Sequence, residues 1–320
     1  MKILANDGVS PEGIERLEAA GFTVVTENVP QDKLIDAINK ENYVALLVRS
    51  ATTARKDLID ACPGLKFIGR GGVGMDNIDV EYARGKGLTV ENTPGASSQS
   101  VAELTMGTMY ALARLTYDSY KEMPKTGADD FKALKKKYSK GIELRGKTLL
   151  IYGFGRIGQT LASYALGAGM KVIGLSLYDE EIEIPITIEG VGEVVAKVKT
   201  TTNVSEALAQ ADFISMNVPK QDGNKAVVGK AEFEKMKDGV RIVNVARGGV
   251  INEDDLLEAL NSGKVAAAAL DVFENEPSPR TDLLSHPGIA STPHIGGQTA
   301  EAQSRIGTEL ADKIIATFKK

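Results

Sequence analysis

The feature that most constrains the fold of this chain is an alternation of short apolar runs with helical patterns, and it occurs twice. In the first series the apolar runs are KILA, FTVV, YVALLV, LKFIG and LTVEN, and the series ends near Asn92. The second series begins at KTLLIYGFGRIG and continues through ADFISMNVP, GVRIVNVA and KVAAAALDVF. Strands that alternate with helices are typical of a parallel sheet covered by helices on both faces. The sequence therefore predicts an α/β protein with two doubly wound parallel sheets.

Several segments outside the two series have patterns of their own. The stretch SSQSVAELTMGTMYALARL predicts a long connecting helix, in which Ser100 and Glu103 have the spacing of a capping box. We interpret the lysine-rich run 132–140 as a solvated surface segment. The run 180–203 alternates like a β-hairpin. The closing segment carries an apolar helical face over 306–318, so we expect it to dock on an existing core.

Composition and charge exclude several classes of protein. The net charge is −5, which provides no field to attract nucleic acid, and no apolar stretch is long enough to cross a bilayer. We therefore expect a cytoplasmic protein with no nucleic-acid partner and no membrane partner. Cys62 is the only cysteine, which fits a reducing compartment, and His286 and His294 are the only histidines, so no metal site is expected.

Two loops have the G-x-G-x-x-G spacing that is typical of dinucleotide sites. The later loop, with Gly153, Gly155 and Gly158, follows the apolar run TLLIY and opens a helix expected from about Arg156 to Leu166. Glycines at these positions allow a tight turn, close approach of a pyrophosphate and close helix–strand packing, while the helix N-terminus supplies partial positive charge. This loop is therefore predicted to hold the cofactor.

The earlier loop, residues 69–74, differs in the residues that come after it. Asp76 and Asp79 are expected in the first turn of the next helix, where two carboxylates would repel a pyrophosphate. A smaller anion could still bind to the loop amides, with Arg70 beside it. We therefore predict that this loop binds the substrate.

The residue that ends the second strand of the later series bears on the choice of cofactor. An NAD site usually carries an acidic residue there, about 20 residues past the glycines, to accept hydrogen bonds from the ribose hydroxyls. Ser176 takes that position, and Asp179 could substitute only if the turn were remodelled. No lysine or arginine occurs between Val172 and Ala196 to bind a 2′-phosphate. We therefore favour NAD as the cofactor, and NADP stays open as the alternative.

Three further stretches, NVARGGVIN, DVFENEP and STPHIGGQT, come at or just beyond expected strand ends, where doubly wound sheets bind their ligands. They provide Arg247, Glu276 and His294 as candidates for one reaction, a hydride transfer between nicotinamide and an alcohol carbon. The imidazole of His294 can exchange the hydroxyl proton near neutral pH. Glu276 can fix its tautomer and favour the imidazolium. The Arg247 guanidinium can bind a substrate carboxylate.

In their order along the chain, the motifs GRGGVGMDNID, GFGRIG, NVARGGVIN, ALDVFENEP and TPHIGGQT resemble those of the D-isomer-specific 2-hydroxyacid dehydrogenases. The resemblance spans almost the whole chain. Within that family it is strongest to the enzymes that oxidise D-3-phosphoglycerate to 3-phosphohydroxypyruvate for serine biosynthesis. It implies that His294, Glu276 and Arg247 are the catalytic residues.

The same resemblance implies further site residues. Asp271 would contact the nicotinamide carboxamide, and the amides of residues 72–74 would hold the substrate carboxylate. Arg49 and Arg70 would lie near the substrate phosphate, and lysines in the run 135–137 would add charge from a partner subunit. The cofactor residues implied are Gly153, Gly155, Arg156, Ile157, Gly158, Ser176, Asp271, Gly296 and Gly297. The substrate residues implied are Arg49, Ser50, Arg70, Gly72, Val73, Gly74, Ser97 and Arg247.

The resemblance also implies a discontinuous fold. Residues 1–97 with 296–320 would form a flavodoxin-like substrate-binding domain, and residues 98–295 would form an inserted Rossmann domain for the dinucleotide. The active site would lie in a cleft between the two domains, closed by a hinge that excludes water. Larger family members carry a regulatory domain after the closing helix, and we expect none here. A homodimer or homotetramer is expected.

Departures from the family pattern keep alternatives open. Ser176 replaces the usual acidic residue, Ser97 stands where the phosphoglycerate enzymes usually have asparagine, and the run 180–203 is longer than expected. The substrate could therefore be another small acid of the glycerate, hydroxypyruvate, glyoxylate or lactate type, although paired arginines suit a phosphate better. A protein that senses NAD and recruits partners is the alternative from another class, because fold alone does not separate it from an enzyme.

Overall fold

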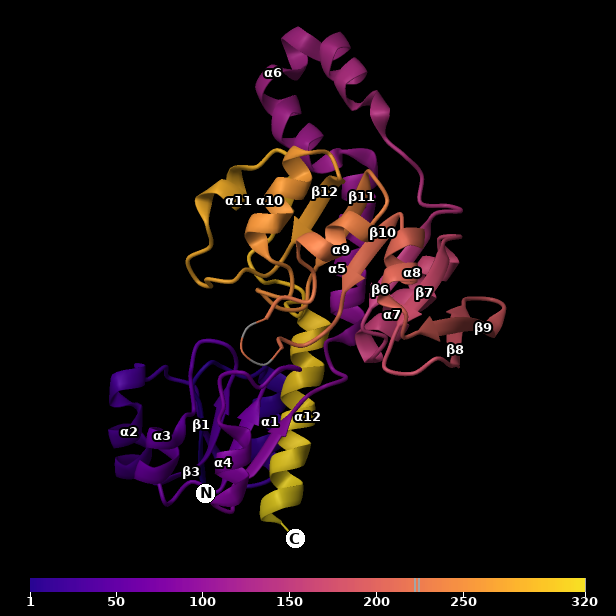
Figure 1. Ribbon diagram of the computed structural model, residues 1–320. Helices are drawn as coiled ribbons and strands as arrows, with labels where there is room; N and C mark the ends of the chain where they lie inside the picture. Colours follow the sequence, from indigo (N-terminus) through magenta and orange to yellow (C-terminus); the bar gives the residue numbers. More distant parts are fainter. Residues whose placement is uncertain (222, 224, 320) are drawn as a thin grey trace. The chain divides into compact units, whose positions relative to one another are not determined.

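The computed structural model describes residues 1–221, 223 and 225–319. It divides into two compact units, Met1–Ser100 with Gly297–Lys320, and Val101–Gly296. Each unit has its own sheet of mainly parallel strands (Figure 1). The predicted fold class, an α/β chain with two doubly wound sheets, is confirmed.

The first unit contains a five-stranded parallel sheet in the order β2-β1-β3-β4-β5. Its strands are β1 (Lys2–Ala5), β2 (Thr23–Val25), β3 (Tyr43–Val48), β4 (Phe67–Arg70) and β5 (Thr89–Asn92). Its helices are α1 (Pro11–Ala19), α2 (Leu34–Glu41), α3 (Lys56–Ala61), α4 (Val80–Gly85) and α12 (Ala300–Phe318), with one 3₁₀ turn, η1 (Gln31–Lys33).

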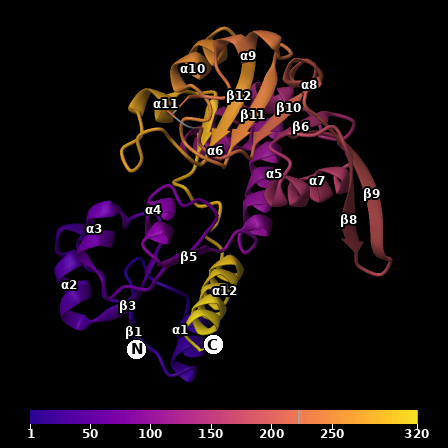
Figure 2. The same cartoon turned by 60° about the horizontal axis from the view of Figure 1, so that its bottom comes forward.

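Helices cover both faces of this sheet because the side chains alternate along each strand. Ile3 and Ala5 of β1 pack with α1 and α12, whereas Leu4 packs on the opposite face with α2, α3 and α4. Figure 2 shows these two groups of helices on either side of the strands. A fully covered parallel sheet leaves the loops at its strand ends as the places where polar groups can reach a ligand.

The closing helix α12 docks on this sheet, as its apolar pattern predicts. Ile306, Leu310 and Ile314 are buried. Near the end of the helix, Phe318 meets Phe22 edge to face, with the ring centroids 6.0 Å apart.

Helices α1 and α12 cross closely at a pair of glycines. A Cβ atom on Gly13 would lie 2.7 Å from the carbonyl oxygen of Gly307, which is closer than real Cβ atoms approach backbone. The absence of a side chain at Gly13 therefore sets how near the closing helix comes to α1.

The second unit contains an eight-stranded sheet in the order β13-β12-β11-β10-β6-β7-β9-β8, in which only β8 runs antiparallel to its neighbour. Its strands are β6 (Thr148–Tyr152), β7 (Lys171–Leu175), β8 (Glu181–Ile188), β9 (Gly192–Thr201), β10 (Phe213–Met216), β11 (Val240–Asn244), β12 (Val265–Leu270) and β13 (Ile289–Ser291). Its helices are α5 (Ser98–Arg114), α6 (Thr116–Lys137), α7 (Arg156–Gly167), α8 (Val204–Gln210), α9 (Lys230–Lys235), α10 (Glu253–Asn261) and α11 (Thr281–Ser285), with one 3₁₀ turn, η2 (Tyr138–Lys140).

This sheet is also covered on both faces. Leu149 and Ile151 of β6 pack in a core with α5 and α7, whereas Leu150 packs in a second core with α8, α9 and α10. The alternation of buried side chains along one strand thus builds two cores, as the apolar run TLLIY predicts.

Strands β8 and β9 form the predicted hairpin. Glu181 pairs with Lys199 and Ile188 pairs with Gly192 in antiparallel register. The end of β9 also pairs in parallel with β7, where Thr200 lies opposite Gly174. The longer segment after β7 therefore adds β8 to the edge of the sheet.

Two local predictions are wrong. The connecting helix α5 begins at Ser98, where the Ser98 N–H donates to the Gly95 carbonyl at 3.2 Å, so Ser100 lies inside the helix and is not its N-cap. Asp76 and Asp79 both precede α4, which starts at Val80. The Asp79 carboxylate accepts from the N–H of Lys56 at 3.0 Å, at the start of α3. It therefore does not cap α4, the helix that follows the glycine loop.

The lysine-rich run 132–140 forms the end of α6 and η2, and its lysines are exposed, as interpreted. Among the described residues, no helix combines the length and the apolar character that crossing a membrane requires.

The substitution Gly13→Ala should lower the free energy of unfolding by about 1–3 kcal/mol, because its Cβ would push against the Gly307 backbone. Helix propensity alone predicts the opposite sign. Gly85→Ala is the matched control, since a Cβ on Gly85 of α4 meets nothing within 4 Å. Urea unfolding of the three proteins measures the difference. An equal or higher stability of Gly13→Ala would show that the two helices do not need the glycine.

Candidate active site

Three loops of the second unit meet at the carboxyl ends of neighbouring parallel strands. Strands β11, β12 and β13 lie side by side in the sheet, and the loops that follow them carry Arg247, Glu276 and His294. Backbone hydrogen bonds connect these loops, from the Asp271 N–H to the Asn244 carbonyl at 2.9 Å and from the Thr292 N–H to the Leu270 carbonyl at 3.0 Å. The topology thus collects residues that are far apart in the sequence at one edge of the sheet.

His294 and Glu276 form a pair. The Nδ1 atom of His294 lies 2.7 Å from Oε2 of Glu276, and both side chains are partly exposed. The backbone of His294 is left-handed, with φ of 55°, which is uncommon for a residue with a side chain. This conformation directs the imidazole to the carboxylate, and it leaves Nε2 as the ring nitrogen that can exchange a proton with a ligand.

The surroundings of Glu276 favour its ionised form. Burial alone would raise the pKa of this carboxyl group. The hydrogen bond with His294, the hydrogen bond from the Phe273 N–H at 3.0 Å and the charge of Arg247 outweigh burial, so the pKa of Glu276 is lowered from its usual value. A carboxylate held in this form stabilises a positive charge on the imidazole beside it.

Arg247 sits in a turn that Asn244 organises. The side-chain amide of Asn244 donates to the Arg247 carbonyl at 3.0 Å, and its oxygen accepts from the Ala246 N–H at 3.1 Å. Asn244 is buried at the end of β11, so the sheet itself fixes this turn. The charge of Arg247 acts on Glu276, which brings the third residue of the predicted trio to the same place.

Asp271 directly follows β12 and is 1% exposed. One of its carboxylate oxygens accepts from the Thr292 hydroxyl at 2.6 Å and the Ile295 N–H at 2.8 Å, and the other accepts from the Gly296 N–H at 2.8 Å. In this structure Asp271 therefore holds the loop that carries His294. The resemblance implied a contact with nicotinamide, and the support of this loop is a role that the sequence did not indicate.

The later glycine loop lies between β6 and α7, as predicted. Gly153 has φ of 99°, and a Cβ there would lie 2.6 Å from the Asn217 carbonyl oxygen. A Cβ on Gly158 would lie 2.9 Å from the side chain of Ile151, whereas a Cβ on Gly155 would meet nothing within 4 Å. Arg156 and Ile157 open α7, whose N-cap provides no side-chain hydrogen bond. The loop thus has a tight turn, an open approach and a free helix N-terminus, the features that a pyrophosphate needs.

At the end of β7, Ser176 is half-buried and its N–H donates to the Thr201 carbonyl at 3.1 Å. Asp179 accepts a hydrogen bond from the Thr202 N–H, so its carboxylate holds the turn into the hairpin. Leu177 and Tyr178 between them are strongly exposed. The carboxylate of Asp179, which the sequence offered as a substitute for the missing acidic residue at Ser176, is therefore already engaged with backbone.

In the first unit, the earlier glycine loop follows β4. Gly72 has φ of 135°, and the guanidinium of Arg70 occupies the space where a Cβ of Gly72 would lie. The Gly72 N–H donates to the Thr93 hydroxyl at 2.8 Å, so this amide is not available to a ligand as the prediction required. Within the described part of the chain, the N–H groups of Val73 and Gly74 have no hydrogen-bond partner.

Arg49 directly follows β3 and is half-buried. Its backbone N–H donates to the Asp7 carboxylate at 2.6 Å, and the described part of the chain offers its guanidinium no hydrogen-bond acceptor. Burial lowers the pKa of Arg49, and the nearby charge of Asp7 opposes that shift. A half-buried guanidinium without an acceptor is suited to an anion. Ser50 beside it is exposed.

Ser97 is buried just before α5, and its side chain lies 3.6 Å from where a Cβ of Gly297 would be. Asp7, Thr93, Asn244 and Asp271 thus support the predicted site residues. Their common signal in the sequence is a polar side chain at the end of a strand: Asn244 is the last residue of β11, Thr93 and Asp271 come directly after β5 and β12, and Asp7 comes two residues after β1.

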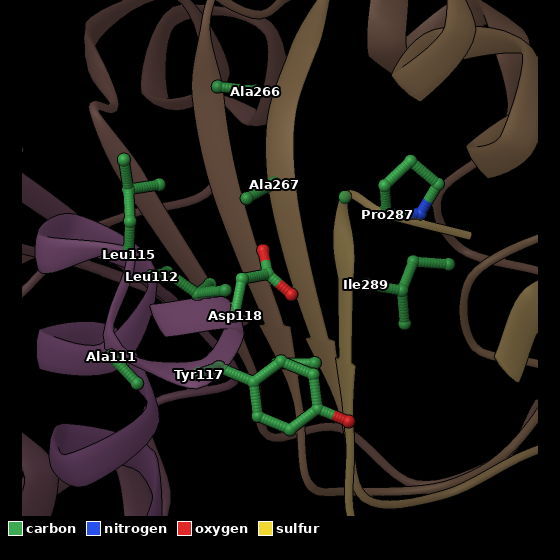
Figure 3. A pocket seen from close by; sticks show the side chains of 11 residues that line it. Ala111, Leu112, Leu115, Tyr117, Asp118, Ala266, Ala267, Pro287 and Ile289 are labelled. Carbon is green, nitrogen blue, oxygen red and sulfur yellow. The ribbon is translucent and has the colours of Figure 1, made fainter. Parts of the chain in front are cut away.

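A separate small pocket of about 70 Å³ lies in the second unit. Figure 3 shows it between the junction of α5 and α6 and the first residues of β12 and β13, lined mainly by apolar side chains such as Leu112, Leu115 and Ile289. None of the predicted site residues lines this pocket.

The chain belongs to the D-isomer specific 2-hydroxyacid dehydrogenase family, whose NAD-binding domain model matches residues 106–296. It is 42% identical to a hydroxypyruvate reductase of Thermotoga maritima, over 98% of this chain and 97% of that protein. It is also 42% identical to a D-3-phosphoglycerate dehydrogenase of Methanocaldococcus jannaschii, over 98% of this chain but only 57% of that protein. Among solved structures it resembles a glyoxylate reductase of Paecilomyes thermophila, with a TM-score of 0.84 and 29% identity over 100% of this chain and 95% of the other.

Membership of this family makes the chain an oxidoreductase with an NAD-binding domain. The predicted enzyme class and cofactor are thereby confirmed, while the roles of individual residues stay predictions.

The substitution Glu276→Gln should make the free energy of unfolding depend less on pH in the acid range. The folded pKa of Glu276 lies below its usual value of 4.5, so the carboxylate contributes stability above that pH, and this contribution is lost as the pH falls through the folded pKa. The variant should therefore be less stable at pH 7 and should lose less further stability down to about pH 3. Glu234→Gln, an exposed glutamate in α9, is the control. Denaturant titrations across this range give the two slopes, and parallel curves for Glu276→Gln and the native protein would contradict the assignment.

Proposed function

We propose that this protein oxidises D-3-phosphoglycerate to 3-phosphohydroxypyruvate with NAD, and that His294, Glu276 and Arg247 carry the reaction. The observation that carries the proposal is the pair of His294 and Glu276 at 2.7 Å, with the charge of Arg247 acting on the carboxylate. Proton removal from a 2-hydroxy acid requires an imidazole, a carboxylate that orients the imidazole, and a guanidinium that binds the substrate carboxylate.

The residues present fit a dinucleotide. Gly155 leaves room for a pyrophosphate at the N-terminus of α7, and Gly153 and Gly158 permit the tight turn and the close packing that form the loop. Arg156 and Ile157 are the first residues of that helix. When bound, NAD supplies the acceptor for the hydride. We propose that the second unit binds it, with Ser176 at the ribose and with Asp271, Gly296 and Gly297 near the nicotinamide.

In the oxidation, Nε2 of His294 takes the hydroxyl proton of the substrate while the hydride leaves C2. Glu276 stabilises the imidazolium that forms, since its carboxylate lies on the other ring nitrogen. Arg247 binds the substrate carboxylate and orients the reacting carbon. In the reverse direction the imidazolium returns the proton to the keto oxygen.

The first unit is proposed to bind the anionic ends of the substrate. The N–H groups of Val73 and Gly74, beside Gly72, are donors for a carboxylate. Among the described residues, none provides a hydrogen-bond acceptor for the guanidinium of Arg49, and the guanidinium of Arg70 lies at Gly72 in the glycine loop. Two guanidinium groups suit a phosphate. Ser50 and Ser97 are proposed to border this group.

The second candidate is reduction of hydroxypyruvate to D-glycerate. It is favoured by the Thermotoga maritima hydroxypyruvate reductase, because that relative matches over nearly its whole length. The same reversible reaction underlies both candidates, and their substrates differ only in a phosphate group. The test is therefore whether the arginines of the first unit contribute to turnover of the phosphorylated acid.

We also propose a role in serine biosynthesis, a cytoplasmic location and a homodimer or homotetramer. Large apolar side chains exposed on α5 and α6 support self-association, among them Tyr110, Tyr120, Met123 and Phe131.

Oxidation of NADH and NADPH should be followed with 3-phosphohydroxypyruvate, hydroxypyruvate, pyruvate and glyoxylate. We expect the highest kcat/KM with NADH and the phosphorylated acid. Arg49→Gln should lower that kcat/KM about ten- to one-hundredfold, since a hydrogen bond to a charged group contributes about 1.5–3 kcal/mol. Its effect on hydroxypyruvate should be smaller. Arg55→Gln, which removes an exposed guanidinium paired with Asp79, is the matched control. A preference for hydroxypyruvate, with equal effects of Arg49→Gln on both acids, would establish the second candidate instead.

His294→Ala should lower kcat by at least about a thousandfold while NADH still binds, since the imidazole carries the proton and the glycine loop holds the cofactor. Stopped-flow turnover and fluorescence titration with NADH measure the two effects. His286→Ala is the control, because His286 follows α11 on the surface and is the only other histidine. If His294→Ala loses NADH binding as well, the residue supports the fold of the loop and is not the proton carrier.

A further inference from the structure

A buried carboxylate outside the predicted trio stands at the start of α10. Glu253 is the first residue of that helix, yet it is only 5% exposed, whereas Asp254 next to it is exposed. An acidic residue in the first helical turn interacts well with the helix dipole from the surface. Burying it is unfavourable unless its oxygens accept hydrogen bonds. The position of Glu253 therefore calls for a partner inside the protein.

The partner is the loop that carries Glu276. One carboxylate oxygen of Glu253 accepts from the Glu274 N–H at 2.8 Å. The preceding N–H, that of Phe273, donates to Glu276 at 3.0 Å. Two successive amides are thus each bound by a carboxylate, one from α10 and one from the pair with His294.

A second contact joins the same two segments. A Cβ on Gly248, the residue after Arg247, would overlap the Phe273 carbonyl oxygen and would lie 2.7 Å from the Glu274 nitrogen. The backbone beside Arg247 therefore lies directly against the peptide group that links Phe273 and Glu274. The segment 247–253 contacts the segment 273–276 near both of its own ends.

We propose that Glu253 is a positioning residue, which ties the segment carrying Arg247 to the segment carrying Glu276 and so sets the spacing between the substrate anchor and the His294–Glu276 pair. The proposal rests on the proposed function, because the spacing matters only if these residues act on one substrate. Gly248 permits this contact, and Glu253 holds it.

The surroundings of Glu253 suggest how to test its hydrogen bond separately from its charge. Burial raises the pKa of Glu253, and the nearby carboxylates of Glu274 and Asp254 raise it further, against the hydrogen bond from Glu274 and the charge of Arg280. The other oxygen of Glu253 is buried and has no partner in the described part of the chain. Glutamine has the same shape and keeps the oxygen that accepts from Glu274, so it reproduces the neutral acid.

The experiment compares Glu253→Ala, Glu253→Asp and Glu253→Gln with Asp254→Ala, which removes an exposed acid from the same helical turn. Hydrogen exchange of the Phe273 and Glu274 amides is measured in the protein without substrate, together with kcat and KM for the keto acid that the native enzyme prefers. NADH titration and circular dichroism check that each variant is folded.

We expect Glu253→Ala and Glu253→Asp to speed exchange of the Phe273 amide at least about tenfold, because releasing Glu274 also loosens the hydrogen bond to Glu276. Their kcat/KM should fall about tenfold or more, with KM raised through Arg247 and kcat lowered through Glu276. In Glu253→Gln both the exchange rate and kcat/KM should stay within about threefold of the native values, and Asp254→Ala should leave both unchanged. If Glu253→Ala does not fold, Glu253→Asp provides the same comparison.

An unchanged Phe273 amide in both shortened variants would overturn the proposal, and so would a Glu253→Gln variant as damaged as Glu253→Ala. The exchange measurement needs no substrate. A native protein that reduces none of the keto acids would therefore contradict the proposed function, while the exchange rates would still decide whether Glu253 holds the loop.

Discussion

Asp271 directly follows strand β12 and is 1% exposed, and three donors from the next loop satisfy its carboxyl group. Leaving such a group without partners would cost several kcal/mol, on the order of the whole margin by which a protein is stable. The loop that follows β13 therefore has to fold around Asp271, and in doing so it presents His294 with its left-handed backbone. The geometry of the predicted trio follows from that one buried side chain and from the parallel order of β11, β12 and β13.

The two glycine loops show that the spacing of the glycines alone does not determine what a loop binds. Both have the same pattern of glycines, and both lie after a parallel strand. They differ in the space around the second glycine: a Cβ on Gly155 would meet nothing within 4 Å, whereas a Cβ on Gly71 would lie 3.1 Å from the side chain of Ile306. Repulsion by Asp76 and Asp79 required both residues to lie in the first turn of α4, but that helix starts at Val80, and the Asp79 carboxylate binds the start of α3. The loop after β4 is set apart by the side chains that its neighbours place around it.

The fold could be predicted because it follows from short-range patterns. Alternating apolar runs, a hairpin over 180–203 and an apolar stripe on the closing helix each depend on residues close in sequence. The site was predictable only as a set of residue types at strand ends. The distance of 2.7 Å between His294 and Glu276, the engagement of the Gly72 amide by Thr93 and the burial of Glu253 depend on long-range packing, to which no local pattern points. The predicted start of α5 failed for a local reason: a turn from Gly95 to Ser98 begins the helix at Ser98, before the capping-box spacing of Ser100 and Glu103.

The hairpin of β8 and β9 also determines which strand forms one edge of the sheet. In the sheet order, β8 is the last strand beyond β7, so one of its edges is not covered by a neighbouring strand of that sheet. An open edge is a template on which a further strand can pair, and proline or charged side chains oppose this. Pro185 lies in the middle of β8, after Glu181 and Glu183. The extension that lengthens the sheet thus also carries the residues that discourage aggregation through it.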